Sequence, residues 1–99
     1  MKRLCSTSEL PLEGKAKEFS VEGKMVCVAN VNGRLAALDN VCPHRGGQLG
    51  LGVVLDGKVI CPWHGWAYDP QTGAIAHLPD EKIPVYPIKV EGEDVLIEL

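Results

Sequence analysis

Turn signals recur at short intervals along this chain of 99 residues, and they restrict its possible folds more than any other feature. Each signal separates two short apolar segments. The four signals are Glu22-Gly23, Asn32-Gly33, Asp56-Gly57 and the stretch 91–94. Asn-Gly and Asp-Gly accept positive φ at both central positions of a turn, as two-residue connections between antiparallel strands require. The segments beside these turns are therefore expected to pair as β-hairpins.

The flanking segments alternate apolar and polar residues with a period of two, which is typical of strands with one buried face. The alternating apolar sets are Met25, Cys27, Ala29 and Val31; Tyr86, Ile88 and Val90; and Val95, Ile97 and Leu99. No stretch shows helical periodicity over three turns, and seven prolines and eleven glycines interrupt any long helix. The pattern predicts an all-β fold of short antiparallel strands.

Two segments lack this alternation. Residues 42–52 contain four glycines, and residues 61–66 hold two tryptophans, a proline and a glycine. Between them, residues 53–55 and 58–60 are expected to form a hairpin around Asp56-Gly57. Such a hairpin would hold the two irregular loops side by side, as a site built from both loops requires. A chain this short cannot divide into two cores, so one domain is expected.

Charge and hydropathy exclude several classes of partner. Ten basic and thirteen acidic residues give a net charge of −3, and no basic run occurs, which argues against nucleic acid and anionic membranes. No apolar run approaches the length of a membrane span, and residues 2–9 do not resemble the apolar core of a signal peptide. We therefore expect a cytoplasmic protein with no membrane partner.

Each irregular loop supplies one cysteine and one histidine: Cys42-Pro-His44 and, after sixteen intervening residues, Cys61-Pro-Trp-His64. Four such ligands can hold zinc or an iron–sulfur cluster. Structural zinc sites usually take like ligands from each loop, whereas each loop here mixes the two types. Mixed pairs suit a two-iron cluster in which one iron takes both thiolates and the other takes both imidazoles. The spacing favours a [2Fe–2S] cluster over zinc.

The sequence around these residues resembles the paired signature loops of Rieske proteins, in Cys42-Pro43-His44-Arg45-Gly46 and Cys61-Pro62-Trp63-His64-Gly65-Trp66. The resemblance implies one Rieske domain over residues 1–99. An antiparallel β basal part would cover about 1–39 and 71–99, and an inserted cluster-binding part about 40–70. It also implies one [2Fe–2S] cluster bound by Cys42, His44, Cys61 and His64.

Within that family the pattern is most similar to the ferredoxins of bacterial ring-hydroxylating oxygenases. The resemblance implies a monomeric electron-transfer protein, not an enzyme, which passes single electrons from a flavoprotein reductase to a terminal oxygenase. A small redox subunit of a nitrite reductase is an alternative, and so is a zinc-stabilised interaction module. The chain is not expected to be the oxygenase itself, because a mononuclear iron site needs two further histidines and only His77 remains. It also has no Gly-rich dinucleotide fingerprint.

Departures from other Rieske proteins bear on the reduction potential. Respiratory and photosynthetic members carry an extra cysteine in each loop, and the equivalent positions here are Gly47 and Trp63, which implies no disulfide between the loops. Trp66 stands where those proteins place a serine that donates to cluster sulfur, whereas Tyr68 matches a family tyrosine that can hydrogen-bond a ligand sulfur. Fewer donors predict a potential in the lower third of the Rieske range of roughly −150 to +300 mV.

Two further expectations concern residues outside the signature loops. In relatives, a third loop carries a proline over the cluster, and the segment 76–79 is expected to correspond to it. Cys5 and Cys27 have no histidine beside them, and we expect both to be ordinary buried thiols.

Overall fold

The computed structural model describes residues 1–41, 48–62, 65–76 and 78–99, and residues 42–47, 63–64 and 77 lie outside the described part. The elements are β1 (Lys2–Ser6), η1 (Thr7–Glu9), β2 (Ala16–Val21), β3 (Lys24–Val31), β4 (Arg34–Asp39), η2 (Leu49–Leu51), β5 (Val53–Leu55), β6 (Lys58–Ile60), β7 (Ala67–Tyr68), β8 (Ala74–Ile75), β9 (Leu78–Lys82), β10 (Val85–Tyr86), β11 (Ile88–Glu91) and β12 (Asp94–Ile97). In the described part of the chain, the helical segments η1 and η2 are single 3-10 turns. The predicted all-β class is thus confirmed. Among the described residues, no helix has the length and apolar character to cross a bilayer.

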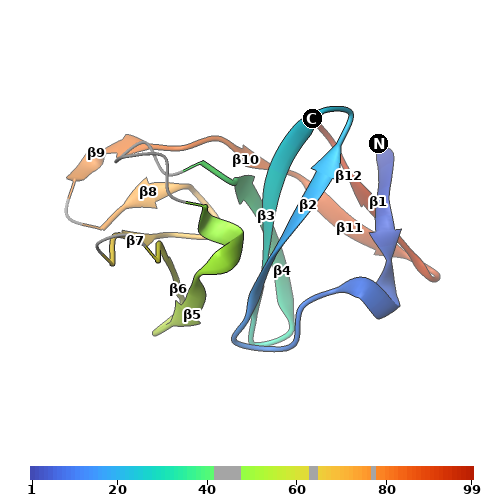
Figure 1. Cartoon of the computed structure of the whole chain (residues 1–99), viewed down its shortest axis with the longest axis horizontal. Coiled ribbons are helices and arrows are strands. Elements are labelled where there is room, and N and C mark those ends of the chain that lie inside the picture. Colours follow the sequence, from blue (N-terminus) through green and yellow to red (C-terminus); the bar gives the residue numbers. More distant parts are fainter. Residues whose placement is uncertain (42–47, 63–64, 77) are drawn as a thin grey trace.

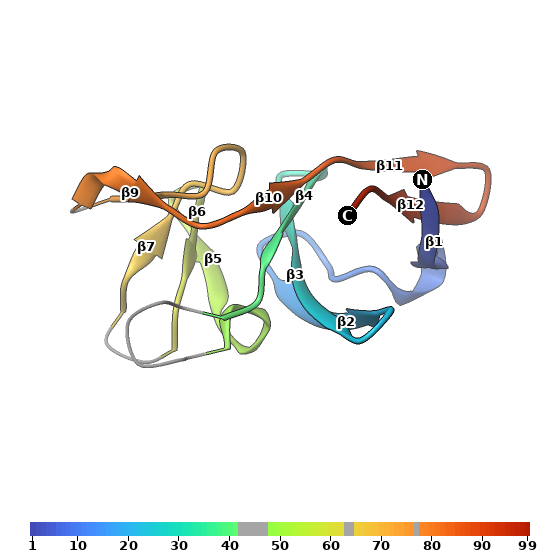
Figure 2. The same ribbon diagram turned by 90° about the horizontal axis from the view of Figure 1, so that it is seen from above.

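Strands β1 to β12 form three antiparallel sheets along an elongated molecule of 37 × 26 × 20 Å. The sheet β5-β6-β7-β8-β9 lies at one end, β10-β4-β3-β2 in the middle, and β1-β12-β11 at the other end with both termini (Figure 1). The strands β9, β10 and β11 follow one another along one side of the molecule and connect the three sheets (Figure 2). The five-stranded sheet β5-β6-β7-β8-β9 is the one next to the predicted ligand loops.

The predicted turns are present and adopt the backbone conformation that their residues favour. φ is positive at both central residues of three turns: 49° and 80° at Glu22-Gly23, 55° and 88° at Asn32-Gly33, and 52° and 75° at Asp56-Gly57. In the fourth turn φ is 61° at Gly92, and the flanking strands β11 and β12 are paired. Local turn chemistry thus sets the hairpin register.

The predicted hairpin beside the ligand loops is also present. β5 pairs with β6 from Val53 opposite Ile60 to Leu55 opposite Lys58. The sheet continues through β7 and β8 to β9, which ends at Lys82. The boundary expected near residue 70 falls in the turn between β7 and β8, so the strands of this sheet extend past it on both sides.

The central strands of the middle sheet, β3 and β4, are buried on both faces because they separate two apolar cores. In β3, Cys27 and Ala29 belong to one core, while Val26 belongs to the other. The expectation of one buried face in β3 was therefore incomplete, and Met25, at one end of that predicted face, is exposed. The first core lies toward the five-stranded sheet and consists of Cys27, Ala29, Leu38, Leu49, Val59, Cys61, Tyr68, Ile75 and Ile83. The second consists of Val21, Val26, Ala37 and Ile97.

Candidate metal centre

The second ligand loop begins at Cys61, directly after β6, and leads into β7. The Cys61 backbone N–H donates to the Trp66 carbonyl at 2.8 Å, and the Gly65 N–H donates to the Cys61 carbonyl at 3.2 Å. Gly65 has φ of 70°, a left-handed conformation that glycine adopts without steric cost. These bonds close the loop on itself, so the Cys61 backbone is fixed at its base.

The first ligand loop is closed in a similar way. Val41 and Gln48, the described residues on either side of 42–47, form an isolated antiparallel bridge. The Leu49 N–H donates to the Asn40 carbonyl at 2.8 Å. Cys42 and His44 lie inside this closed segment but outside the described residues, as does His64 in the second loop.

Cys61 is the one predicted ligand within the described residues, and its surroundings fit an iron–sulfur cluster. Its side chain is 2% exposed and belongs to the core that also contains Val59 and Tyr68. A thiolate in such apolar surroundings is costly unless a positive charge compensates it, and a metal ion supplies that charge. A site that takes one thiolate and one imidazole from each of two closed loops matches the ligand set of a Rieske centre. Among residues 1–41, 48–62, 65–76 and 78–99, no group of three or more Cys, His, Asp or Glu residues is placed to hold a metal ion.

Cys5 and Cys27 are both buried, as expected for ordinary thiols. Burial raises the pKa of the Cys27 thiol to about 12, and the nearby Glu18 carboxylate adds to this effect. Burial also raises the pKa of Cys5, with a smaller contribution from Glu9. Neither thiol is therefore activated as a nucleophile or redox sensor.

Two aromatic side chains accompany the second loop. Tyr68 is fully buried in β7, where its backbone pairs with Val59 and Ile75. Trp66 is partly buried and packs against the same core. Trp66 directly precedes β7 and Tyr68 lies in it, so both follow the second ligand loop. Their expected relations to cluster sulfur remain predictions.

The predicted third loop lies between β8 and β9. The Ala76 N–H donates to the Ala67 carbonyl at 2.9 Å, and Leu78 begins β9 opposite Ile75. His77 lies outside the described residues. The structure thus brings this segment next to β7, which follows the second loop, and its proposed contact with the cluster stays a prediction.

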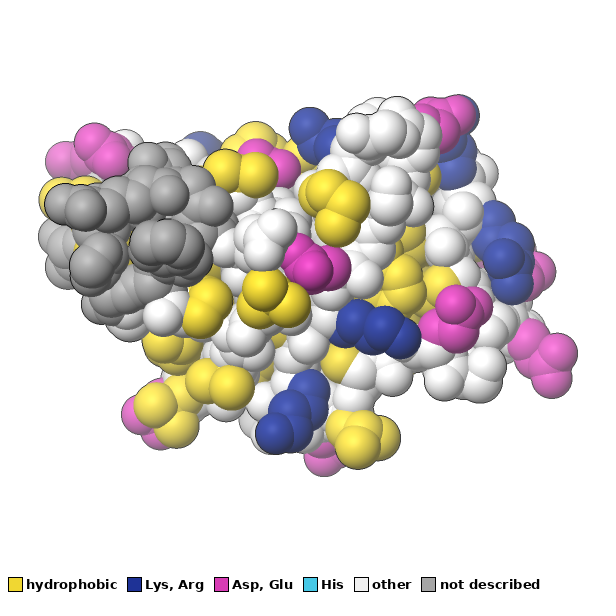
Figure 3. All heavy atoms as spheres, viewed as in Figure 1, with side chains coloured by type: hydrophobic (Ala, Val, Ile, Leu, Met, Phe, Trp, Pro, Cys, Tyr) yellow, Lys and Arg dark blue, Asp and Glu magenta, His cyan; other side chains and the backbone are white. Residues whose placement is uncertain are grey.

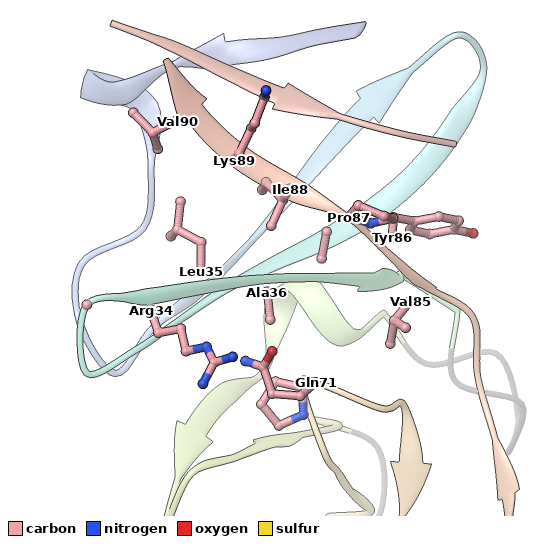
Figure 4. A pocket seen from close by; sticks show the side chains of 13 residues that line it. Arg34, Leu35, Ala36, Gln71, Val85, Tyr86, Pro87, Ile88, Lys89 and Val90 are labelled. Atoms are coloured by element: carbon pink, nitrogen blue, oxygen red, sulfur yellow. The ribbon is translucent and has the colours of Figure 1, made fainter. Parts of the chain in front are cut away.

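Two surface grooves differ in their relation to the candidate centre. One, of about 720 Å³, lies between β4, β11 and the turn at Pro70, and the Arg34 and Gln71 side chains point toward each other across it (Figure 4). Cys61 does not line this groove. The other, of about 620 Å³, includes Val41 next to the first ligand loop. Basic, acidic and apolar side chains are interspersed over the face seen in Figure 3, in keeping with the small net charge.

The sequence profile of the Rieske [2Fe-2S] domain matches residues 1–87. The chain belongs to the Rieske family. It is 36% identical to the biphenyl dioxygenase ferredoxin subunit of Pseudomonas sp. (strain KKS102), over 97% of this chain and 89% of that protein. It is 35% identical to the ferredoxin component of the naphthalene 1,2-dioxygenase system of Pseudomonas aeruginosa, over 92% of this chain and 88% of the relative.

Solved structures give the same result for the fold of this Rieske domain. The ferredoxin of carbazole 1,9a-dioxygenase from Nocardioides aromaticivorans IC177 superposes with a TM-score of 0.83 at 28% identity, covering 96% of this chain and 93% of that one. The predicted Rieske iron–sulfur fold and the resemblance to oxygenase ferredoxins are confirmed. The family also confirms an iron–sulfur cluster as the cofactor.

One residue beside the candidate centre was not singled out by the sequence pattern. Asn40 is the buried polar side chain of the described part of the chain, 1% exposed, and it lies two residues before Cys42. Its position at the end of an apolar strand, directly before a ligand loop, was the available signal. That position alone does not reveal its partners, which come from β2 and η2.

Proposed function

We propose that this Rieske protein is a one-electron carrier between a flavoprotein reductase and a terminal ring-hydroxylating oxygenase. The observation that carries the proposal is the match over most of both chains to ferredoxin components of biphenyl and naphthalene dioxygenase systems. Those relatives favour a ferredoxin over a subunit of a nitrite reductase. The Rieske match likewise favours an iron–sulfur carrier over a zinc-stabilised module.

The proposed ligands of a single [2Fe–2S] cluster are Cys42 and Cys61 for one iron and His44 and His64 for the other. Two closed loops beside one hairpin support this assignment, since each loop contributes one thiol and one imidazole. When bound, the cluster supplies reversible one-electron chemistry. The buried Cys61 would keep water away from the thiolate end, and the hairpin β5–β6 would keep the two loops in register.

The remaining parts of the proposal concern the whole molecule. We assign residues of about 40–70 to cluster binding and about 1–39 and 71–99 to the basal part, with strands β8 and β9 extending the cluster-side sheet. A cytoplasmic location and a monomeric state are part of the same proposal. A monomeric carrier can expose its cluster end to the reductase and the oxygenase in turn.

Metal and sulfide analysis of the purified chain tests the cofactor. The expected content is about two iron and two acid-labile sulfide per chain, with negligible zinc. Cys61→Ala should lose the cluster, whereas Cys5→Ala should retain it, because Cys5 lies in β1 of a different sheet. A stoichiometric zinc ion, or an intact cluster in Cys61→Ala, would overturn the assignment.

Reconstitution with partners tests the electron-transfer role. The reduced protein should transfer one electron per chain to a ring-hydroxylating oxygenase and should be reduced again by a flavoprotein reductase. The cluster-free Cys61→Ala variant serves as the control. Isolation of the native protein in a stable complex with a nitrite reductase would favour the subunit alternative.

A further inference from the structure

The Asn40 side chain makes two bonds of opposite kind. Its Oδ1 accepts from the Gly50 N–H at 2.7 Å, and its Nδ2 donates to Glu18 Oε2 at 2.7 Å. Its backbone carbonyl also accepts from the Leu49 N–H. Asn40 precedes loop 42–47, while Leu49 and Gly50 follow it. A single residue therefore ties the two ends of this loop to each other and, through Glu18, to strand β2.

Gly50 is packed against the same two side chains. A Cβ at position 50 would collide with Glu18 Cγ and would lie 2.7 Å from the Glu18 backbone nitrogen and 2.9 Å from Asn40 Oδ1. Contacts this short require the backbone to move. Helix η2 can approach β2 and Asn40 only because residue 50 has no side chain.

The bonds of Asn40 hold its amide in one orientation. Because the side chain is buried, breaking either bond would leave a polar group without a partner, which costs more than the bond itself contributes. Glu18 belongs to β2, which is paired along its whole length with β3. The ends of the loop are thus anchored to a strand that is paired along its whole length in the middle sheet.

We propose that Asn40, acting with Glu18 and Gly50, is a positioning residue for the first ligand loop. It fixes the separation of the loop ends, on which cluster retention by the proposed ligands Cys42 and His44 depends. This inference rests on the proposed function, because it assumes that these two residues are ligands. Groups behind the ligands commonly affect metal retention strongly, since they orient the ligands.

This role can be tested by removing the donor of the bond between residues 40 and 18, and then by restoring the bond with the donor on residue 18. In Asn40→Asp, a carboxylate replaces the amide donor and faces the Glu18 carboxylate, so that bond becomes a repulsion. We expect the cluster to be lost to an iron chelator about tenfold faster at pH 8, and the EPR signal of the reduced protein to change. In the double variant Asn40→Asp/Glu18→Gln, the glutamine amide donates to the aspartate. The total charge is then that of the wild type, and retention, potential and EPR signal should return to wild-type behaviour.

Asn30 provides a matched control. Its Nδ2 donates to the Pro11 carbonyl at 3.0 Å, and its Oδ1 accepts from the Gly33 N–H at 2.8 Å, so it bridges two segments in the same manner outside both ligand loops. Asn30→Asp should lower the melting temperature without changing the EPR signal. If Asn40→Asp does not accumulate as a folded protein, Glu18→Ala removes the link to β2 while it leaves Asn40 itself unchanged, and it should also accelerate cluster loss.

The outcomes separate this inference from the proposed function. If the wild type holds two iron and two sulfide, while Asn40→Asp or Glu18→Ala retains the cluster and EPR signal of the wild type, the positioning role is wrong and the cofactor assignment stands. Failure of Glu18→Gln to rescue Asn40→Asp also overturns the positioning role. If the wild type binds no cluster, the proposed function fails first, and the inference fails with it.

Discussion

Cys27 and Cys61 are both buried, yet their surroundings assign them different chemistry. Cys27 lies in the middle of β3, opposite Glu18 on β2, and burial raises its pKa to about 12. Cys61 lies at the base of a closed loop whose sequence also contains a proposed imidazole ligand, His64. Residue type alone could not separate the two thiols, whereas the neighbouring histidine and the loop context did.

Cys27 should resist alkylation in the folded protein. Because its pKa is raised from 9.0 to about 12, the folded chain keeps the proton between pH 9 and 12 while the unfolded chain releases it. Unfolding therefore becomes easier as pH rises through that window. Iodoacetamide labelling followed by mass spectrometry at pH 9 should modify Cys27 at least about a hundredfold more slowly in the folded than in the unfolded chain. Comparable labelling rates in both states would contradict the assigned pKa.

Two glycines with similar φ should differ in their response to substitution. Gly73 has φ of 80°, and a Cβ there would collide with the Ile83 carbonyl oxygen. Gly57 has φ of 75°, but nothing lies within 4 Å of a Cβ at that position. Gly57→Ala should cost about 1–2 kcal/mol from backbone strain, and Gly73→Ala about 1–3 kcal/mol more from overlap. Thermal unfolding of both variants checks this order, and equal losses of stability would contradict it.

The elements show which features of the fold follow from local sequence. The turns at Asn32-Gly33 and Asp56-Gly57 were predictable because the two residues of each turn determine its conformation. Burial of both faces of β3 was not, because it depends on sheets formed by distant segments. The bond between Glu18 and Asn40 joins residues 22 positions apart, and no local pattern indicates it.

Helix η2 contains one buried and one exposed leucine, which should respond differently to substitution. Leu49 is fully buried in the core that contains Cys61, whereas Leu51, two residues later, is 61% exposed. Leu49→Ala should lower the free energy of unfolding by about 2–5 kcal/mol and weaken cluster retention, because it opens a cavity beside both ligand loops. Leu51→Ala should change stability by less than about 0.5 kcal/mol. Urea unfolding followed by visible absorbance distinguishes the two, and a similar loss in both variants would argue against the packing described.

At the scale of the whole molecule, the predicted family and cofactor follow from a few residues near the ligands. Two Cys–His pairs, two prolines and a glycine indicated the Rieske fold, and the profile match over residues 1–87 confirms it. The extent of the cluster-side sheet was less predictable, because β8 and β9 are short and carry no motif. Charge would explain why two imidazoles replace two thiolates as proposed ligands. Adding an electron to the neutral site that two thiolates and two imidazoles form costs less than adding one to the dianionic site that four thiolates form.

The same reasoning predicts the effect of exchanging an imidazole for a thiolate. His64→Cys adds a negative charge at the proposed cluster and should lower its reduction potential toward the roughly −400 mV of all-thiolate plant-type ferredoxins. Redox titration monitored by visible absorbance measures this shift. An unchanged or higher potential in a variant that holds a cluster would show that charge does not set the potential.

Histidine-specific ¹⁵N labelling tests whether two thiolates and two imidazoles hold the cluster. Electron–nuclear double resonance of the reduced wild-type protein should detect two histidine nitrogens coupled to the unpaired electron. The two couplings should come from His44 and His64 and persist in His77→Ala. A reduced cluster without coupled histidine nitrogen would exclude ligation by His44 and His64, and the loss of a coupling in His77→Ala would place a ligand at the wrong residue.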